Sequence, residues 1–581
     1  MAAQSSALGP DARLGALADL AATTADEPLD VLVIGGGIVG TGSALDAVSR
    51  GLSVGLLEQR DLASGTSSRS SKLVHGGLRY LEMFDFGLVR EALEERGLLL
   101  TRLAPHLVRP VPFLYPLHRT VERPYVGAGL ALYDVLAMVG KYEMGLPKHK
   151  HLFRKQVARM APDLRTDELS GAVRYYDCQV DDARLVVTLA RTAAHHGALV
   201  ATRTRVSGFL REGSRVVGVR ATDLETGTDL EVRARVVVNA AGVWTDDVES
   251  LLGGTPSLDV EASKGIHLVV PRDRIRSECG FITKTERSVL FVIPWGRHWI
   301  IGTTDTAWNL DLAHPAASRT DIEYLLGHVN KLLKVPLDHD DVEGVYAGLR
   351  PLLAGKAGRG VGSGGEGEVA TTKVSREHTV VGPVPGLVLI AGGKLTTYRV
   401  MARDAVDLAV RGWPGVAPSQ TERVPLLGAD GFLTRTNQRV ALSRRSGLEV
   451  GQIDHLLGRF GGMIDELLAL VAARPELAEP LPGTEDYLSA EVVYAVTHEG
   501  ARHLDDVLAR RTRISIETFD RGTVAVTAAA DLMAGELGWD PARRDAEVDH
   551  YLRRVEAERQ SQEKLTDQEA DEARVSAPDI V

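Results

Sequence analysis

The sequence predicts a mixed α/β and α+β protein: an α/β domain with a parallel sheet, an antiparallel sheet inserted into it, and a C-terminal helical domain. Three observations predict this arrangement. A glycine-rich turn stands between two apolar strands near the N-terminus, and residues 250–350 alternate apolar and polar side chains. After about Glu422, apolar residues recur at helical spacing.

The first domain opens with a strand, a turn, a helix and a second strand. Val31–Ile34 is the short apolar run of a buried parallel strand. Gly35 permits a tight turn, Gly37 lets the backbone approach a pyrophosphate, and Gly40 lets the helix pack on the strand. The second strand ends in Glu58, near the roughly 20-residue spacing expected for an acid that binds a ribose hydroxyl. With phosphates favoured at the helix N-terminus, this layout predicts a Rossmann-like dinucleotide site.

The nucleotide-binding pattern returns later in the chain. Residues 183–194 are expected to form a helix, residues 198–202 a strand, and residues 215–238 a meander around a turn at 225–227. A further strand at 387–392 runs into a second glycine turn. The domain is therefore discontinuous, and the interruption includes a predicted hairpin over 289–302.

These changes of pattern divide the chain. We expect a flexible N-terminal extension over 1–28 and a discontinuous nucleotide-binding domain over 29–421, with the sheet domain inserted at about 80–180 and 250–375. A helical domain is expected over 422–555. Residues 556–581 are polar, charged and without aromatics, which predicts a disordered tail.

Composition excludes several classes of protein. The net charge of -11 argues against general nucleic-acid binding. The two cysteines, Cys178 and Cys279, cannot form a disulfide framework or a cysteine metal cluster, and they predict a reduced, cytoplasmic protein. The sequence shows no signal peptide and no apolar stretch long enough to span a membrane. It also shows no histidine–carboxylate spacing typical of a metal site, so we expect no metal.

Several motifs together resemble the FAD-dependent glycerol-3-phosphate dehydrogenase family. These are the respiratory, quinone-linked enzymes within the glycine and D-amino-acid oxidase group of flavoproteins. The matching segments lie at residues 33–40, 66–82, 239–244, 264–267, 301–305, 348–351 and 392–399. The segment 73–80 and the turn Gly393-Lys394 are the most specific, whereas the first glycine motif occurs in many flavoproteins. The extension, a glycine-rich insert at 355–367 and the tail depart from the family pattern but fall in no motif.

The resemblance implies a set of FAD-binding residues. They are Gly35, Gly37, Gly40, Glu58, Thr66, Ser67, Ser71, Lys72, Val206, Ala241, Gly242, Trp244, Gly393, Lys394, Leu395 and Thr396. Lys394 would place a cation near the reduced flavin or bind the substrate.

The resemblance also implies substrate-binding and catalytic residues. Arg350 would hold the substrate phosphate together with Arg79 and Arg376, because the guanidinium fork bonds phosphate bidentately. Tyr80 and Thr304 would touch the substrate. His267 is the expected base for the C2 hydroxyl, since its ordinary pKa lies near working pH. The resemblance thus implies His267, Lys394 and Arg350 as the catalytic residues.

The reaction expected from this resemblance is the FAD-dependent oxidation of sn-glycerol 3-phosphate to dihydroxyacetone phosphate. Hydride would pass to flavin N5 and electrons to a membrane quinone. An oxidase that uses oxygen stays open, as do an amine or amino-acid oxidase and a non-catalytic nucleotide-binding regulator. The cluster of three arginines argues against an amino-acid oxidase, which needs one arginine for a carboxylate.

A lipid-soluble quinone requires contact with the bilayer. The best candidate is the apolar segment 124–140, which is followed closely by Lys148, Lys150 and Lys155. An apolar face beside cations favours a helix lying in the interface of an anionic membrane, although a buried core helix is the alternative. The basic cluster Arg510–Arg513 is a second candidate. We therefore expect a peripheral protein on the inner face of the cell membrane; the oligomeric state, including a homodimer, stays open.

Overall fold

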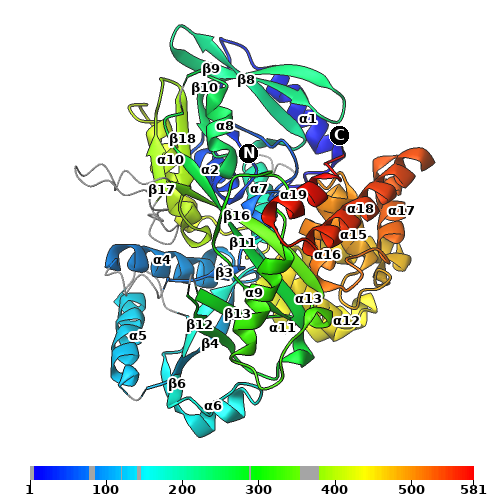
Figure 1. The fold of residues 1–581 in the computed structure, drawn as a ribbon. Coiled ribbons are helices and arrows are strands. Elements are labelled where there is room, and N and C mark those ends of the chain that lie inside the picture. The colour runs from blue at the N-terminus through cyan, green and yellow to red at the C-terminus, as the bar shows by residue number, and fades with distance from the viewer. Residues whose placement is uncertain are drawn as a thin grey trace.

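The computed structural model describes residues 6–77, 85–119, 121–139, 145–254, 256–286, 289–353 and 378–580. Figure 1 shows two sheets, one above the other, with a helical domain along one side. Arg79, Tyr80, Arg376 and the glycine-rich insert 355–367 lie outside the described residues. Within the described ranges, no helix combines the length and apolar character needed to cross a membrane.

The upper sheet is the nucleotide-binding sheet. Its strand order is β17-β18-β10-β1-β2-β7, and β8 and β9 extend β10 as the expected meander. The neighbours from β18 to β7 are parallel. The strands are β1 (Leu29–Ile34), β2 (Val54–Leu57), β7 (Leu199–Ala201), β8 (Thr204–Glu212), β9 (Arg215–Asp223), β10 (Thr228–Asn239), β17 (His378–Val381) and β18 (Leu387–Gly392).

Both faces of this sheet are covered. Val31 and Val33 of β1 pack into the core that includes side chains of the helices α2 (Ile38–Ser49), α7 (Asp182–His195) and α10 (Tyr398–Ala409). Leu32 and Ile34 point to the opposite face, which the meander covers. Burial on both faces explains the uninterrupted apolar run of β1. The glycine turn after β1 therefore lies at the carboxyl edge of the parallel strands.

The lower sheet is mainly antiparallel, and α9 (Arg319–Asn330) packs on it. The predicted hairpin over 289–302 is β13 paired with β14. The strands are β3 (Leu73–Val74), β4 (Arg109–Leu117), β5 (Lys150–Phe153), β6 (Gly171–Gln179), β11 (Val260–Pro271), β12 (Gly280–Lys284), β13 (Val289–Trp295), β14 (His298–Gly302), β15 (Thr306–Trp308) and β16 (Gly344–Leu353).

Helices fill the rest of the described chain. Those beside the two sheets are α4 (Phe86–Leu98), α5 (Glu122–Val139), α6 (Arg154–Met160) and α8 (Thr245–Ser250). The C-terminal domain contains α11 (Phe432–Asn437), α12 (Arg439–Ser446), α13 (Val450–Phe460), α14 (Ile464–Ala473), α15 (Ser489–Thr497), α16 (Ile514–Glu517) and α17 (Val526–Leu537).

Both ends of the described chain are more ordered than the sequence predicted. Residues expected to form a disordered tail continue α18 (Pro541–Gln562) and form α19 (Asp567–Val575). In the N-terminal extension, α1 (Pro10–Ala21) buries Leu20 completely beneath the meander. Composition did not reveal these helices, because they are stabilised by few apolar contacts and by ion pairs with partners far along the chain.

The cluster Arg510–Arg513 is buried, so it does not offer a surface for membrane contact. Arg511 donates to both carboxylate oxygens of Asp61 at 2.7 Å, and Arg513 donates to Asp182 at 2.6 Å. These arginines tie the helical domain to the nucleotide-binding domain.

Candidate active site

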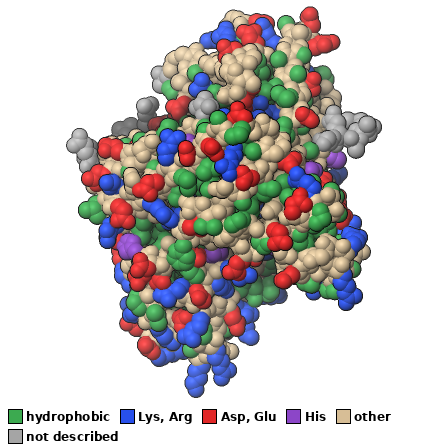
Figure 2. Space-filling model, turned by 90° about the vertical axis from the view of Figure 1, so that its right-hand side faces the viewer, with side chains coloured by type: hydrophobic (Ala, Val, Ile, Leu, Met, Phe, Trp, Pro, Cys, Tyr) green, Lys and Arg blue, Asp and Glu red, His purple; other side chains and the backbone are tan. Residues whose placement is uncertain are grey.

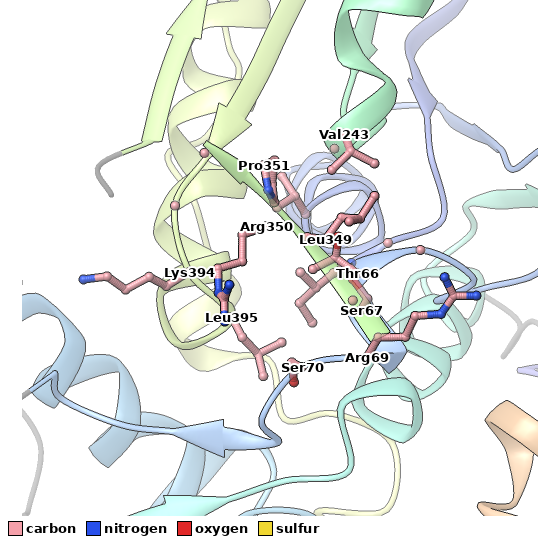
Figure 3. Close-up of a pocket in the computed structure, with 18 of the residues that line it drawn as sticks. Thr66, Ser67, Arg69, Ser70, Val243, Leu349, Arg350, Pro351, Lys394 and Leu395 are labelled. Carbon is pink, nitrogen blue, oxygen red and sulfur yellow. Dashed lines mark hydrogen bonds between the residues drawn. The ribbon is translucent and has the colours of Figure 1, made fainter. Parts of the chain in front are cut away.

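A cavity of about 420 Å³ lies where the carboxyl edge of the upper sheet meets β11 and β16 of the lower sheet. Figure 3 shows residues from both domains around it. The residues expected at the site that line it are Gly35, Gly37, Glu58, Thr66, Ser67, Ser71, Val206, Ala241, Gly242, Trp244, His267, Arg350, Gly393, Lys394, Leu395 and Thr396.

The glycine turn forms the floor of one end. Gly35 has φ +110°, and a Cβ there would lie 2.7 Å from the carbonyl oxygen of Ala240. A Cβ on Gly40 would lie 1.9 Å from the carbonyl oxygen of Gly35, so Gly40 supports the close packing of the helix and does not itself line the cavity. Glu58 accepts a hydrogen bond from the amide of Gly36 at 2.6 Å, which places its carboxylate at the turn.

The small-residue loop after β2 covers this end. Thr66 Oγ1 donates to the carbonyl oxygen of Leu349 at 2.6 Å, and Ser67 Oγ accepts from the amide of Ile38 at 3.0 Å. These bonds join the loop to β16 and to the start of α2. Thr66 and Ser67 therefore hold the loop against both domains.

Lys72 does not line the cavity. Its ammonium is fully buried, 2.8 Å from Asp182 Oδ1 and 3.1 Å from the carbonyl oxygen of Ser68. The cation is turned inward because Asp182, at the start of α7, needs compensation in the interior. Its position differs from the expected contact with the cofactor.

His267 lies in the wall formed by β11. Ser71 Oγ is 2.8 Å from its Nε2, and the ring of Tyr346 is stacked on it at 4.7 Å between centroids. Nδ1 is buried without a hydrogen-bond partner among the described residues. Burial, reinforced by the charges of Arg350 and Lys72, lowers the pKa of His267 well below its usual 6.5. The ring is therefore neutral at physiological pH, with one nitrogen free of a proton, but its pKa lies below the working range that the sequence argument assumed.

Arg350 crosses over the strand that carries His267. A Cβ on Gly265 would lie 2.4 Å from Arg350 Nη2, so the glycine makes room for the guanidinium. Arg350 Nη2 donates to Thr303 Oγ1 at 3.0 Å and to the carbonyl oxygen of Thr304 at 3.1 Å. Asp305 Oδ1 lies 3.4 Å from Nη1. The guanidinium is thus held at the cavity by its neighbours.

Thr303 lines the cavity and Thr304 does not. The buried hydroxyl of Thr304 instead accepts from the amide of Ile266 at 3.0 Å. The residue that faces the cavity is thus one position earlier than the sequence predicted. The sequence did not reveal which of the two threonines faces the cavity. β14 ends at Gly302, so the alternation of side chains along a strand does not extend to them.

The second glycine turn closes the other end. A Cβ on Gly393 would lie 2.4 Å from Met401 Sδ, and the residue has φ +79°. Thr396 Oγ1 accepts from the amide of His75 at 3.1 Å, which joins this turn to the loop after β3. Lys394 also lines the cavity, and in the view of Figure 3 its side chain extends away from Arg350.

Sequence reasoning missed several lining residues, including Arg60 and Arg69. Arg60 follows Glu58 closely, and its guanidinium lies 5.4 Å from the ring centroid of Trp244. Arg69 stands within the small-residue loop and donates to the carbonyl oxygen of Ala313 at 2.9 Å. Arg69 lies within the segment 66–82 that resembles the family, and this position could have identified it as a site residue.

The geometry fits FAD. A glycine turn at a helix N-terminus and a carboxylate at the next strand end form the nucleotide end of the cavity. The far end carries a neutral histidine and an arginine beside a second glycine turn. The cavity therefore joins a dinucleotide cradle to a site where an anionic substrate can bind.

Comparison with known proteins agrees with this assignment. A family model described as FAD dependent oxidoreductase matches residues 30–408. A second, described as the C-terminal domain of alpha-glycerophosphate oxidase, matches residues 419–544. These matches cover the nucleotide-binding and sheet domains and then the helical domain.

Individual relatives are also similar. Glycerol-3-phosphate dehydrogenase 2 of Mycobacterium tuberculosis is 54% identical over 575 residues, covering 99% of this chain and 95% of the relative. The glycerol-3-phosphate dehydrogenase of Mycobacterium leprae is 54% identical over 576 residues, again covering 99% and 95%. A crystal structure of the glycerol-3-phosphate dehydrogenase from Bacillus halodurans, complexed with FAD, superposes with a TM-score of 0.77 at 29% identity, covering 94% of this chain and 98% of that one. The cofactor of this protein is FAD, and the chain belongs to the FAD-dependent glycerol-3-phosphate dehydrogenase family.

Proposed function

We propose that this protein oxidises sn-glycerol 3-phosphate to dihydroxyacetone phosphate and passes the electrons to a quinone dissolved in the membrane. One observation supports the proposed reaction most directly. A neutral, buried histidine and a partly exposed arginine, His267 and Arg350, share one cavity with the FAD-binding turns. The choice of glycerol 3-phosphate as substrate rests on the names of the relatives. The cavity supplies a base for its hydroxyl group and a cation for its phosphate.

Oxidation of the C2 alcohol to a ketone removes one proton from oxygen and one hydride from carbon. His267 would accept the hydroxyl proton, because a neutral imidazole ring has one nitrogen without a proton. Ser71 and Tyr346 hold the ring in place for this role. FAD, when bound, supplies the two-electron acceptor for the hydride.

Arg350 would bind the substrate phosphate. Its fork is already oriented by Thr303 and by the carbonyl oxygen of Thr304, so little further ordering is required on binding. Arg79, Tyr80 and Arg376 lie outside the described residues, and their contribution to the phosphate site stays a prediction. Lys394 would add positive charge to the same cavity.

The helix α5 supports the proposal of a membrane acceptor. It covers residues 124–139 of the apolar segment singled out in the sequence, and the exposed positions among its described side chains are all apolar: Pro124, Tyr125, Ala128, Ala131, Leu132, Val135 and Met138. Tyr125 is 69% exposed and Met138 54%. The alternative of a buried core helix fits only the face of α5 opposite these side chains, where Tyr133 and Ala137 are buried. A helix with one buried and one exposed apolar face fits binding in the plane of a bilayer surface.

Basic side chains follow α5 in the chain. Lys148, Lys150 and Lys155 are exposed, and His151 of β5 lies against Gly127 of α5. Figure 2 shows Lys and Arg side chains gathered at the lower end of the molecule, where Figure 1 places α6. Asp134, the acidic residue in the middle of α5, has its Oδ2 2.7 Å from Nδ1 of His149. Positive charge beside an apolar face favours attachment to anionic lipid.

The acceptor can be tested directly. Purified protein loaded with FAD should turn from yellow to colourless when sn-glycerol 3-phosphate is added without oxygen, and glycerol should not replace it. A short-chain quinone should then reoxidise the flavin much faster than air does. The oxidase remains the second candidate, because the helical domain matches a family model named for an oxidase. Rapid peroxide formation with oxygen as sole acceptor would favour that candidate.

A further inference from the structure

The end of the chain folds back onto the FAD cavity. The turn before α19 is joined to the start of α9: the amide of Arg319 donates to the carbonyl oxygen of Lys564 at 2.7 Å, and Thr320 Oγ1 donates to that of Leu565 at 2.7 Å. Figure 1 shows α19 beside β16, and Asp579 pairs with Arg60 of the nucleotide-binding domain. The segment Asp567–Ile580, which we name the C-terminal strap, therefore lies over both domains of the site.

The strap packs against the wall of the cavity. Ala570 is completely buried in a cluster with Val243, Leu349 and Trp308. Val243 and Leu349 line the FAD cavity, and Figure 3 labels both among the lining residues. Removing support behind them would let this wall relax, because close-packed apolar groups keep their positions only with neighbours on both sides.

An ion pair joins the strap to the nucleotide end of the cavity. Asp579 Oδ2 lies 2.6 Å from Arg60 Nε, and Asp579 Oδ1 lies 3.3 Å from His314 Nε2. Burial alone would raise the pKa of Asp579, but the hydrogen bond with His314 and the charge of Arg60 hold it well below its usual range. The carboxylate is therefore ionised and fixes the guanidinium of Arg60.

Arg60 is well placed to transmit this contact. Its amide donates to Glu58 Oε1 at 2.7 Å, its guanidinium lies over the ring of Trp244, and all three residues line the cavity. Glu58 is the acid expected to bind the ribose of FAD. Asp579 thus positions a cation at the nucleotide end from 519 positions away in the sequence.

A third contact joins the strap to the catalytic strand. Asp567 Oδ1 lies 2.6 Å from Lys264 Nζ, which is completely buried and also lies 2.6 Å from Asp321. Lys264 and His267 belong to the same strand, β11. The strap is therefore bound at its start to the substrate side of the cavity and at its end to the nucleotide side.

We propose that the C-terminal strap is part of the cofactor site: Asp579 positions Arg60, Ala570 supports Val243 and Leu349, and together they slow the release of FAD. No atom of the strap lines the cavity, so its residues act through the wall and are positioning residues. The contacts explain why a polar, charged segment is folded against this part of the molecule.

The test uses full-length, FAD-loaded protein. The variant Asp579→Asn keeps the size of the side chain and removes its charge, and the release of FAD after dilution is followed by the rise of flavin fluorescence. Loss of a charge-assisted hydrogen bond should speed release about tenfold. The matched control is Glu572→Gln, which removes one charge from an exposed position of α19 and should leave the release rate unchanged.

A double-mutant cycle separates this role from a general loss of stability. If Asp579 acts through Arg60, Asp579→Asn should add little to the release rate of Arg60→Gln. FAD should also raise the melting temperature of Asp579→Asn, measured against its own cofactor-free form, by less than it raises that of the wild type. A chain ending after Ser576 provides a second variant if Asp579→Asn fails to fold. Wild-type FAD release in either variant, or additive effects in the cycle, would overturn the proposal.

Discussion

Ser71 Oγ lies 2.8 Å from Nε2 of His267, although the two residues are 196 positions apart in the sequence. One comes from the loop that covers the nucleotide end and the other from the substrate-side strand β11. The hydroxyl bonds to one ring nitrogen, while the stacked ring of Tyr346 restricts rotation. The orientation of the proposed base is therefore set jointly by both domains.

We expect Ser71→Ala to slow flavin reduction by substrate about tenfold, the effect of losing one hydrogen bond worth about 1–1.5 kcal/mol. KM should change little, because Ser71 would orient the base and not the phosphate. Anaerobic stopped-flow absorbance measures the rate. Ser71→Thr retains the hydroxyl and should restore most of it. Equal rates for Ser71→Ala and the wild type would show that the ring needs no such support.

The low pKa of His267 predicts an unusual acid limit for the reaction. Protonation of His267 removes the base, and it occurs only at a pH well below 6.5, the ordinary pKa of histidine. The rate of flavin reduction should therefore stay level as pH falls from 8 through 6.5 and decline only in more acidic buffer. His267→Ala should lower the rate by ~10²–10⁴-fold and abolish that decline. His195→Ala, at an exposed histidine, is the control and should behave like the wild type.

The proposed phosphate contact can be tested at Arg350. Arg350→Ala should cost about 2–3 kcal/mol of substrate binding and raise KM roughly 30- to 150-fold. Flavin content, read from absorbance, should stay at one per chain, since the nucleotide end is untouched. Arg350→Lys keeps the charge but loses the planar fork, so an intermediate KM is expected. Competition by glycerol as strong as that by glycerol 3-phosphate would contradict a phosphate contact.

Membrane attachment through α5 predicts sensitivity to charge in the neighbouring basic segment. Replacing Lys148, Lys150 and Lys155 with Glu should release the protein from anionic liposomes in a sedimentation assay, without changing activity toward a soluble dye acceptor. The matched control puts the same charge change on the exposed residues of α12, Arg439, Arg444 and Arg445. Sedimentation of both variants like the wild type would place the membrane contact elsewhere.

Lys72 is predicted to stabilise the fold and not to bind FAD. Lys72→Met should lower the free energy of unfolding by on the order of 3 kcal/mol, because it leaves part of the buried charge of Asp182 uncompensated. Thermal unfolding of the cofactor-free protein measures the loss, and flavin titration should give an unchanged affinity. A weakened affinity at unchanged stability would instead support the contact with FAD that the sequence predicted.

The sequence by itself determined the nucleotide-binding end of the molecule. The turn residues Gly35, Gly37 and Gly40, and Glu58 at the next strand end, could be identified because they act within one local unit of strand, turn and helix. Spacing along the chain is enough to place such residues. The family resemblance then supplied His267, Arg350 and Lys394, all of which line the cavity.

Only the tertiary structure decided which side chains near those motifs point into the cavity. Lys72 is turned inward by Asp182, and Thr303 replaces Thr304 at the wall. These outcomes depend on partners more than a hundred positions away or on the exact end of a strand, which local pattern does not encode.

The tail shows the same limit most clearly. Its polar composition predicted disorder, because few apolar groups were available to offset the entropy of ordering the chain. The structure folds it through Ala570 and the ion pairs of Asp567 and Asp579. Each of these contacts has its partner in another domain. A segment of this kind gains its stability only when the rest of the molecule is already assembled around the cavity.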